Sequence, residues 1–546
     1  MLARVSVAPA ANDPRSSHIA MWCSIALILS VSAAFNSAFI YHGLNRIDEA
    51  WQLYAAMRLH AGGTLYDDVL WVFPPAHVWS AWLAWWIDPP GLVQARLIYA
   101  AFDLALCTSV YLVARRIMEQ PFALLAGLLV AIAAPLGHAY QSMFGFRYLV
   151  FSMLALLAFE WRLRGHRPYW MVISGALVGV AVVFRLTPAF SVSCGIAVAL
   201  VAAYRTPRLW IAEGLRFALG LLLVLTPVLL WFSQTVGLQQ FFHEVVIHPL
   251  AMLQPRPPPD VNFPTSWSRI EIHNFFVAAQ FRVIWLFYFG YGAAVLISWL
   301  RGSREMRPAL SLLTALTVFG AVFFIRSTGR SDEPHLDSVI PPACMLVAHL
   351  CNVCFNAFWR PTARAGARRL ASAALVVAVL GAWAFLGNVD RVTQQPAADV
   401  RRLEATHQRI LVQPVQKSFR IDRTVHLLRR FTKPEDTILN LDNSPVFHIL
   451  SGRMGPGYLD TIMPGTFVDD EAEIGFLERL KADPPAAVVW PTQDFDGMEE
   501  RSFKRVAPRI AEWVTTNYTA IPRQNRWVVM LWRGDGDNSE PTPSEL

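Results

Sequence analysis

The sequence predicts an all-α membrane domain with about 11 spanning helices, followed by a small soluble α/β domain. Three observations predict this organisation. The 546 residues are 54% hydrophobic and only 16% charged, whereas an average soluble chain carries about 25% charged residues. Apolar runs long enough to cross about 30 Å of hydrocarbon recur from residue 20 to residue 388. From residue 389 onward the composition becomes that of a soluble domain.

The apolar runs have the length that spanning helices require. The first run is longer than the apolar core of a signal peptide, which is about 7–15 residues, so we expect an uncleaved first helix after a cytoplasmic segment, residues 1–19. The predicted spans cover residues 20–42, 93–113, 121–140, 143–161, 169–186, 188–204, 217–236, 283–300, 309–325, 338–356 and 370–388. Together they form a predicted membrane domain, residues 20–388.

Arginine is distributed unevenly between the loops that join these spans. If the amino terminus is cytoplasmic, every alternate loop is basic, as the positive-inside rule requires. The predicted cytoplasmic loops contain Arg115, Arg116, Arg162, Arg164, Arg167, Arg205, Arg208, Arg216, Arg301, Arg304, Arg307, Arg360, Arg364, Arg368 and Arg369. Because the number of spans is odd, the carboxy-terminal domain is expected outside.

Two long loops are expected on the outer side. The first, residues 43–92, ends in Pro74-Pro75 and an aromatic stretch that is too short to span. Trp79, Trp82 and Trp86 recur there at helical spacing, which predicts an interfacial amphipathic helix. The second loop, residues 237–280, is rich in proline and is expected to be irregular.

The carboxy-terminal region, residues 389–533, reads as a small α/β domain outside the membrane. Residues 437–442, 487–490 and 527–532 have the apolar pattern of buried strands, and residues 476–481 have a helical pattern. The polar tail, residues 534–546, is expected to be disordered.

Two adjacent carboxylates, Asp48 and Glu49, follow the first predicted span. Acids beside lipid are costly unless they are hydrated, paired or used, so a functional role is the first hypothesis. A structural alternative stays open, because Asp48 can also cap a helix over residues 49–60, whose first turn favours acidic side chains.

A late outside loop, residues 326–337, gathers charge in a short stretch that includes Arg330, Asp332 and His335. One interpretation is an ordinary solvated loop. The other is an anion site in which Arg330 and His335 contact a phosphate, because a guanidinium group suits bidentate phosphate contact. Two isolated arginines, Arg147 and Arg185, are predicted on the same side. They either reach lipid headgroups or converge on the same anion.

Several functions find no support in the residues. The net charge of +7 comes without a basic stripe that is interleaved with aromatic residues, so nucleic acid is not an expected partner. The sequence has no glycine-rich nucleotide loop and no Gly-x-Ser-x-Gly motif. Cys351 and Cys354 form a single Cys-x-x-Cys, which is typical of packing. His243 and His248 lack the supporting ligands of a metal centre, and the metal question stays open.

The outside-loop motifs resemble those of the GT-C membrane glycosyltransferases. The first loop opens with Asp48-Glu49-Ala-Trp-Gln-Leu-Tyr, continues with Arg58 and a Gly62-Gly63-Thr-Leu-Tyr-Asp67 step, and reaches Phe73-Pro74-Pro75 before the aromatic stretch. The segment Gly329-Arg330-Ser-Asp332-x-x-His335-Leu336 resembles a late outside-loop motif of bacterial members. The pattern is most similar to bacterial relatives of protein O-mannosyltransferases and to lipid A aminoarabinose transferases, over residues 20–390.

This resemblance implies transfer of a sugar from a polyprenyl-phosphate carrier to a hydroxyl acceptor on the outer face of the cytoplasmic membrane. The acceptor would be a glycan, a glycolipid or a protein. Asp48 is the first candidate for the base and Glu49 the second. Arg330, His335, Arg185 and Arg147 are candidates for the donor-phosphate site. Arg58, His77 and Asp332 are further candidates, and a divalent cation is an open possibility.

One position departs from the family pattern. Aminoarabinose transferases carry a lysine just before the Pro-Pro pair, and this chain has Phe73 there. His77 or the arginines would therefore have to take over the binding of the phosphate.

Two other classes of function compete with the transferase. A transporter or flippase of lipid-linked sugars would commonly show internal repeats and charges within its spans. In a non-catalytic scaffold, Asp48 and Glu49 would have no function.

Overall fold

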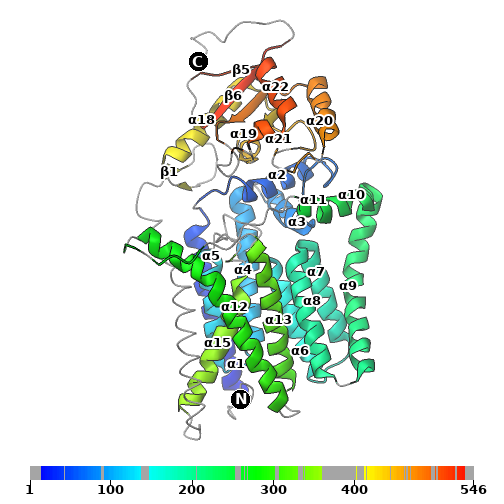
Figure 1. Ribbon diagram of the computed structural model, residues 1–546, viewed down its shortest axis with the longest axis vertical. Coiled ribbons are helices and arrows are strands. Elements are labelled where there is room, and N and C mark those ends of the chain that lie inside the picture. The colour runs from blue at the N-terminus through cyan, green and yellow to red at the C-terminus, as the bar shows by residue number, and fades with distance from the viewer. Residues whose placement is uncertain are drawn as a thin grey trace.

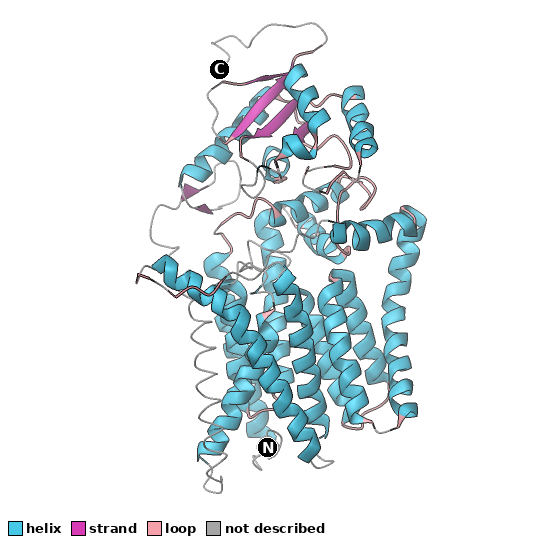
Figure 2. Cartoon of the chain, in the orientation of Figure 1, coloured by secondary structure: helices cyan, strands magenta, loops and turns pink. Residues whose placement is uncertain are grey.

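A computed structural model shows a helical bundle with a small sheet domain beyond one end (Figure 1). The structure describes residues 14–41, 43–87, 91–136, 147–204, 206–251, 260–263, 265–266, 269–301, 307–329, 336, 339–359, 401–402, 411–412, 415–442, 444–459, 462, 465–467, 469–493, 499, 502–522 and 526–534. Colouring by secondary structure separates the helical bundle from the part that contains the strands (Figure 2).

Ten long helices form the described part of the bundle. They are α1 (Pro14–Phe39), α4 (Leu92–Ala114), α5 (Gln120–Leu136), α6 (Arg147–Leu163), α7 (Tyr169–Phe184), α8 (Leu186–Ala203), α9 (Pro207–Thr235), α12 (Arg269–Arg301), α13 (Arg307–Gly329) and α15 (Ile340–Trp359). Within the described residues, seven helices are long and apolar enough to cross a membrane, and α5 and α7 contain shorter apolar segments. The chain is therefore a multi-pass membrane protein. The predicted span over residues 370–388 lies outside the described residues.

The bundle is packed closely where glycines face a neighbouring helix. Gly175 on α7 lies against Phe217 of α9, and Gly220 on α9 lies against Val172 of α7, so that a Cβ atom at either glycine would overlap backbone atoms of the other helix. Small residues allow this approach in membranes, where van der Waals packing rather than the hydrophobic effect holds helices together.

The first long loop, residues 43–92, forms the layer between the bundle and the sheet domain. It contains α2 (Asp48–His60), α3 (Ala76–Trp82) and a 3-10 turn, η1 (Leu83–Trp86). The aromatic stretch is therefore helical, as predicted. A second arm of this layer consists of α10 (Leu238–Phe242), a π-helical turn η2 (His243–Ile247) and α11 (His248–Ala251). The prediction of an irregular loop over residues 237–280 was wrong for these residues and for residues 269–280, which belong to α12. The prolines on which it rested lie mainly between these two parts, at residues 255–264.

The carboxy-terminal region begins with two short paired strands, β1 (Arg401–Arg402) and β2 (Leu411–Val412). A four-stranded sheet follows, in the order β3-β4-β6-β5, with β3 (Ile438–Asn440) parallel to β4 (Ala487–Pro491). Strand β6 (Trp527–Trp532) runs antiparallel to β4 and to β5 (Tyr518–Ala520). The accompanying helices are α18 (Val415–Phe431), α19 (Val446–Ser451), α20 (Asp470–Ala482), α21 (Phe503–Val506) and α22 (Pro508–Asn517). The predicted strands and the predicted helix all occur.

The sheet domain packs on this first long loop. Buried apolar residues of both regions form one continuous core. Arg58 on α2 donates to the carbonyl oxygens of Gly455 and Gly457 at 3.2 and 3.1 Å, and the amide of Gly455 donates to the hydroxyl of Tyr54 at 2.6 Å. The ring of Tyr54 stacks on His448 of α19 with a centroid distance of 4.5 Å. These contacts fix α2 between the membrane helices and the sheet.

Candidate functional site

Helix α2 presents Asp48 in its first turn, and Asn45 supports that turn. The side-chain oxygen of Asn45 accepts from the backbone amides of Ile47 and Asp48 at 2.9 and 3.0 Å. Its amide nitrogen donates to the carboxylate of Asp48 at 3.2 Å. The amides of Ala50 and Trp51, which a capping Asp48 would satisfy, donate instead to the backbone carbonyl oxygens of Asn45 and Ile47, at 3.2 and 2.8 Å. The half-buried Asp48 carboxylate is oriented by Asn45 instead of being the helix cap.

Glu49 has a different environment from its neighbour. Its carboxylate is fully buried and accepts two hydrogen bonds from Arg96 of α4, at 2.7 and 2.8 Å. Arg96 is equally buried and also donates to the carbonyl oxygens of Ile40 and Gly43, at 2.8 and 2.9 Å. This bidentate ion pair joins the end of α1, the start of α2 and the start of α4. It holds Asp48 in place from the adjacent position.

Phe73 lies in a constrained turn before α3. The hydroxyl of Tyr66 donates to the carbonyl oxygen of Phe73 at 2.7 Å, and the indole of Trp71 donates to that of Pro74 at 3.2 Å. Tyr66 has a φ of 72°, the one positive φ of a non-glycine residue in the part of the chain that the structure describes. A large residue adopts this conformation only where its surroundings enforce it.

Arg185 occupies the turn between α7 and α8 and lies over the ring of Phe73. Its guanidinium carbon is 4.8 Å from the ring centroid, which is a cation–π distance. Arg326, Tyr148 and Asp48 all interact electrostatically with this guanidinium group. Arg326, near the end of α13, also donates to the hydroxyl of Tyr148 at 3.4 Å. The structure thus brings Asp48 and two arginines together at the end of the bundle that faces the sheet domain.

The side chains of His77 and Arg58 make packing and backbone contacts. The imidazole of His77 is fully buried and packs edge-on against Tyr148 and Phe184, with centroid distances of 6.0 and 5.6 Å. His77 therefore lies beside Phe184, the residue that precedes Arg185. Arg58 uses its guanidinium group to hold backbone carbonyls of the sheet domain, as described above.

Other predicted site residues lie beyond what the structure describes. Arg330, Asp332 and His335 fall outside the described residues. Arg147 is the first residue of α6, and its side chain is likewise outside the description.

His243 and His248, on the second arm of the layer between the bundle and the sheet domain, both lie beside Glu244. His243 and His248 each place Nδ1 near the buried carboxylate of Glu244, at 3.1 and 2.8 Å. Burial alone would raise the pKa of Glu244, but the hydrogen bonds with His248 and His243 hold it below its ordinary value. Across the described residues, no group of three or more His, Cys, Asp and Glu side chains is arranged to hold a metal ion.

Sequence reasoning missed three residues of this region. Arg96 and Asp103 are buried charged residues inside α4, and a charge within a predicted span is a signal that could have singled them out. Arg326 was placed in the late loop without a role of its own. Its pairing with Tyr148 depends on a contact between helices that are far apart in sequence, so no local pattern shows it.

Two solved structures share this architecture over nearly the whole chain. Both are ArnT from Cupriavidus metallidurans. The structure bound to undecaprenyl phosphate has a TM-score of 0.54 and 17% identity, covering 93% of this chain and 97% of that one. The apo structure has a TM-score of 0.54 and 16% identity, covering 95% and 98%. No family model and no curated protein sequence matches the chain. The similarity confirms the fold that the resemblance implied.

Proposed function

We propose that this protein transfers a sugar from a polyprenyl-phosphate donor to a hydroxyl acceptor on the outer face of the cytoplasmic membrane. The observation that carries the proposal is that Asp48 and Arg326 both lie close enough to Arg185, at one end of the bundle, to act on its charge. The shared fold supports it, because the ArnT structure of that fold is bound to undecaprenyl phosphate.

The residues fit the two halves of such a reaction. A hydroxyl group is a poor nucleophile, and a carboxylate beside it assists by taking its proton as the new bond forms. Asp48 is the base in this scheme. The departing lipid phosphate gains charge, which fixed cations stabilise, and Arg185 and Arg326 are placed to do so. A single in-line displacement would invert the anomeric configuration.

The remaining candidates take supporting roles in this proposal. Glu49 acts as a positioning residue through Arg96, since both of its carboxylate oxygens are already engaged. Arg330, His335 and Arg147 complete the donor-phosphate site, and Asp332 borders it. Arg185 takes the place of the lysine that the family carries at the position of Phe73. Arg58 holds the sheet domain, and His77 supports the Arg185 turn.

The proposed topology follows from the same assignment. The membrane domain, residues 20–388, has eleven spans, with residues 1–19 in the cytoplasm and the α/β domain, residues 389–533, outside. Ten described helices agree with ten of these spans. The donor is a hexosyl or pentosyl polyprenyl phosphate. A flippase would not require a carboxylate such as Asp48 close enough to Arg185 to act on its charge.

Transfer by the full chain in nanodiscs tests the proposal. Labelled sugar should move from an undecaprenyl-phosphate donor to an envelope extract, and Asp48→Asn should slow transfer at least about a hundredfold, the low end expected for loss of a general base. Asp67→Asn is the matched control, because Asp67 is an exposed acid of the same loop. Full activity in Asp48→Asn, or flipping of the donor without transfer, would refute the proposal.

A further inference from the structure

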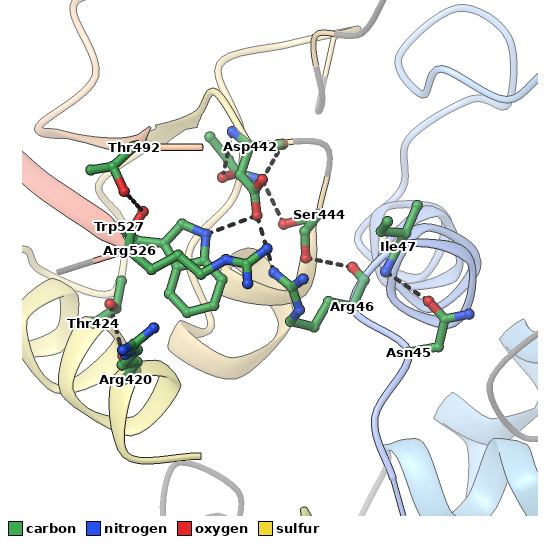
Figure 3. Close-up of polar contacts among 11 residues, drawn as sticks. Asn45, Arg46, Ile47, Arg420, Thr424, Asp442, Ser444, Thr492, Arg526 and Trp527 are labelled. Atoms are coloured by element: carbon green, nitrogen blue, oxygen red, sulfur yellow. Dashed lines mark hydrogen bonds and ion pairs between the residues drawn. The ribbon is translucent and has the colours of Figure 1, made fainter. Parts of the chain in front are cut away.

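The sheet of the carboxy-terminal domain meets the first outside loop at the edge where parallel strands usually bind ligands. Strands β3 and β4 both end at this edge, where Asp442 and Thr492 follow them. Strand β6 starts here with Trp527, preceded by Arg526. The carboxyl edge of a parallel sheet is the common ligand position in α/β domains. Here Arg46 of the first loop reaches into it (Figure 3).

Two guanidinium groups share this edge and make few contacts. Both lie over the indole of Trp527, with Arg46 at 5.0 Å and Arg526 at 5.2 Å from the ring centroid. Arg46 has one polar side-chain contact, at 3.5 Å from the carboxylate of Asp442. The guanidinium group of Arg526 has no hydrogen-bond partner among the described residues. In Figure 3 both side chains reach toward Asp442.

Among the residues that the structure describes at this edge, positive charge exceeds negative charge. Asp442 supplies one negative charge, and its Oδ2 atom also accepts from the indole nitrogen of Trp527 at 2.9 Å. The Arg46 side chain is only 22% exposed. Burial and the nearby Arg526 lower its pKa, and Asp442 raises it. Arg526 is also half-buried, and two like charges held together with little access to water are costly unless a further anion joins them. Paired guanidinium groups have the donor geometry that binds a phosphate or a carboxylate.

We propose that Arg46 and Arg526 form a binding site for a phosphate or carboxylate group carried by the acceptor. The role as an acceptor site rests on the proposed function, because the edge is directly connected to the proposed base. The hydroxyl of Ser444 donates to the carbonyl oxygen of Arg46 at 2.6 Å, and Asp48 follows Arg46 by two residues. The sheet domain would thus recognise the anionic group of the acceptor while the loop presents its hydroxyl to Asp48.

The backbone that carries Arg526 is held independently of its side chain. The amide and the hydroxyl of Thr492 both donate to the carbonyl oxygen of Arg526, at 3.0 Å each. A substitution of the Arg526 side chain should therefore leave the edge folded. Arg505→Gln is the matched control, since Arg505 is an exposed arginine of the same domain that pairs with the exposed Glu499, and such surface pairs contribute little to stability.

Binding to the full chain in phosphatidylcholine nanodiscs tests the site without requiring turnover. Glucose 6-phosphate should bind at least about tenfold more tightly than glucose, and Arg526→Gln should remove about a tenfold preference, as expected for a charge-assisted hydrogen bond. Arg505→Gln should leave both affinities unchanged. Undecaprenyl phosphate should bind equally to the wild type and to Arg526→Gln, because the donor phosphate occupies the Arg185 site.

Three results would overturn the inference. The first is an unchanged preference for glucose 6-phosphate in Arg526→Gln, or no such preference in the wild type. The second is weaker binding of undecaprenyl phosphate in Arg526→Gln, which would give the site to the donor. The third is equal affinity for inorganic phosphate and glucose 6-phosphate. This result would show that the site binds a free anion and does not recognise the sugar of an acceptor. If the anion preference is present and no sugar transfer occurs, the proposed function fails and the anion site stands.

Discussion

Asp48 and Glu49 are adjacent in the chain and have opposite environments. Asp48 is half-buried and close enough to Arg185 to act on its charge, whereas Glu49 is fully buried with Arg96. The sequence predicted that this pair of acids matters, and it placed Asp48 first. It could not separate their roles, because the partner of Glu49 lies 47 residues further along the chain. A local motif identifies an unusual charge, and only the fold shows which charge is already neutralised.

Glu49→Gln should destabilise the protein strongly. Removing one partner of a buried ion pair leaves the other charge uncompensated, which costs about 3–5 kcal/mol. The thermal unfolding midpoint in detergent measures the loss. The double variant Glu49→Gln/Arg96→Gln should be less destabilised than the sum of the two single variants, because it leaves no buried charge. Additive losses would show that the pair does not act as a unit.

Glu244 should make the outer layer sensitive to acid. Its hydrogen bonds with His248 and His243 lower its pKa in the folded protein, against the effect of burial. A carboxyl group with a lowered folded-state pKa contributes stability above its ordinary pKa of about 4.3, and that contribution is lost as the pH falls through the lower folded value. The unfolding midpoint of Glu244→Gln should therefore vary less with pH than that of the wild type below about pH 4.3. Identical pH profiles would contradict this role.

At the scale of the elements, apolar length and strand patterns predicted most of the architecture. The ten described bundle helices, three of the four strands of the sheet and the aromatic helix α3 occur where expected, whereas strand β5 was not predicted. The helical arm over residues 238–251 was not predicted, since the neighbouring prolines dominated the interpretation of that loop. Some of the arginines that make the alternate loops basic also have a local structural role. At the far end of the bundle, Arg162 and Arg216 pair with the buried Glu213 at 2.7 and 2.5 Å.

The crossing of α7 and α9 should tolerate no side chain at its closest point. Gly220→Ala would place a methyl group against the backbone of Val172 and Ala176, and overpacking of this kind costs about 1–3 kcal/mol. Gly214→Ala is the matched control on the same helix, because a Cβ atom at Gly214 meets no atom within 4 Å. A lower unfolding midpoint for Gly220→Ala than for Gly214→Ala is expected, and equal midpoints would refute the close crossing.

At the scale of the whole molecule, the sheet domain is part of the site region. Contacts between α2 and the sheet domain join residues that are 397 and 401 positions apart in the chain. No sequence pattern could predict them, because residue spacing reports on neighbours within an element and not on which surfaces dock. The consequence is that the loop with Asp48 is held from two sides, by Arg96 of the bundle and by the loop around Gly455.

The proposed function requires Asp48 and the sheet domain to lie on the same side of the membrane, outside. A membrane-impermeant maleimide should therefore label Asp67→Cys, in the first loop, and Arg423→Cys, on α18, in sealed cells that express a cysteine-free background. Arg208→Cys, at the start of α9, should react only after the membrane is permeabilised, because its loop is predicted to be cytoplasmic. All three positions are exposed, so accessibility on the protein surface does not limit labelling. If positions 67 and 423 label from opposite sides, the sheet domain cannot rest on the loop of Asp48, and neither the proposed transfer nor the acceptor site can operate as described.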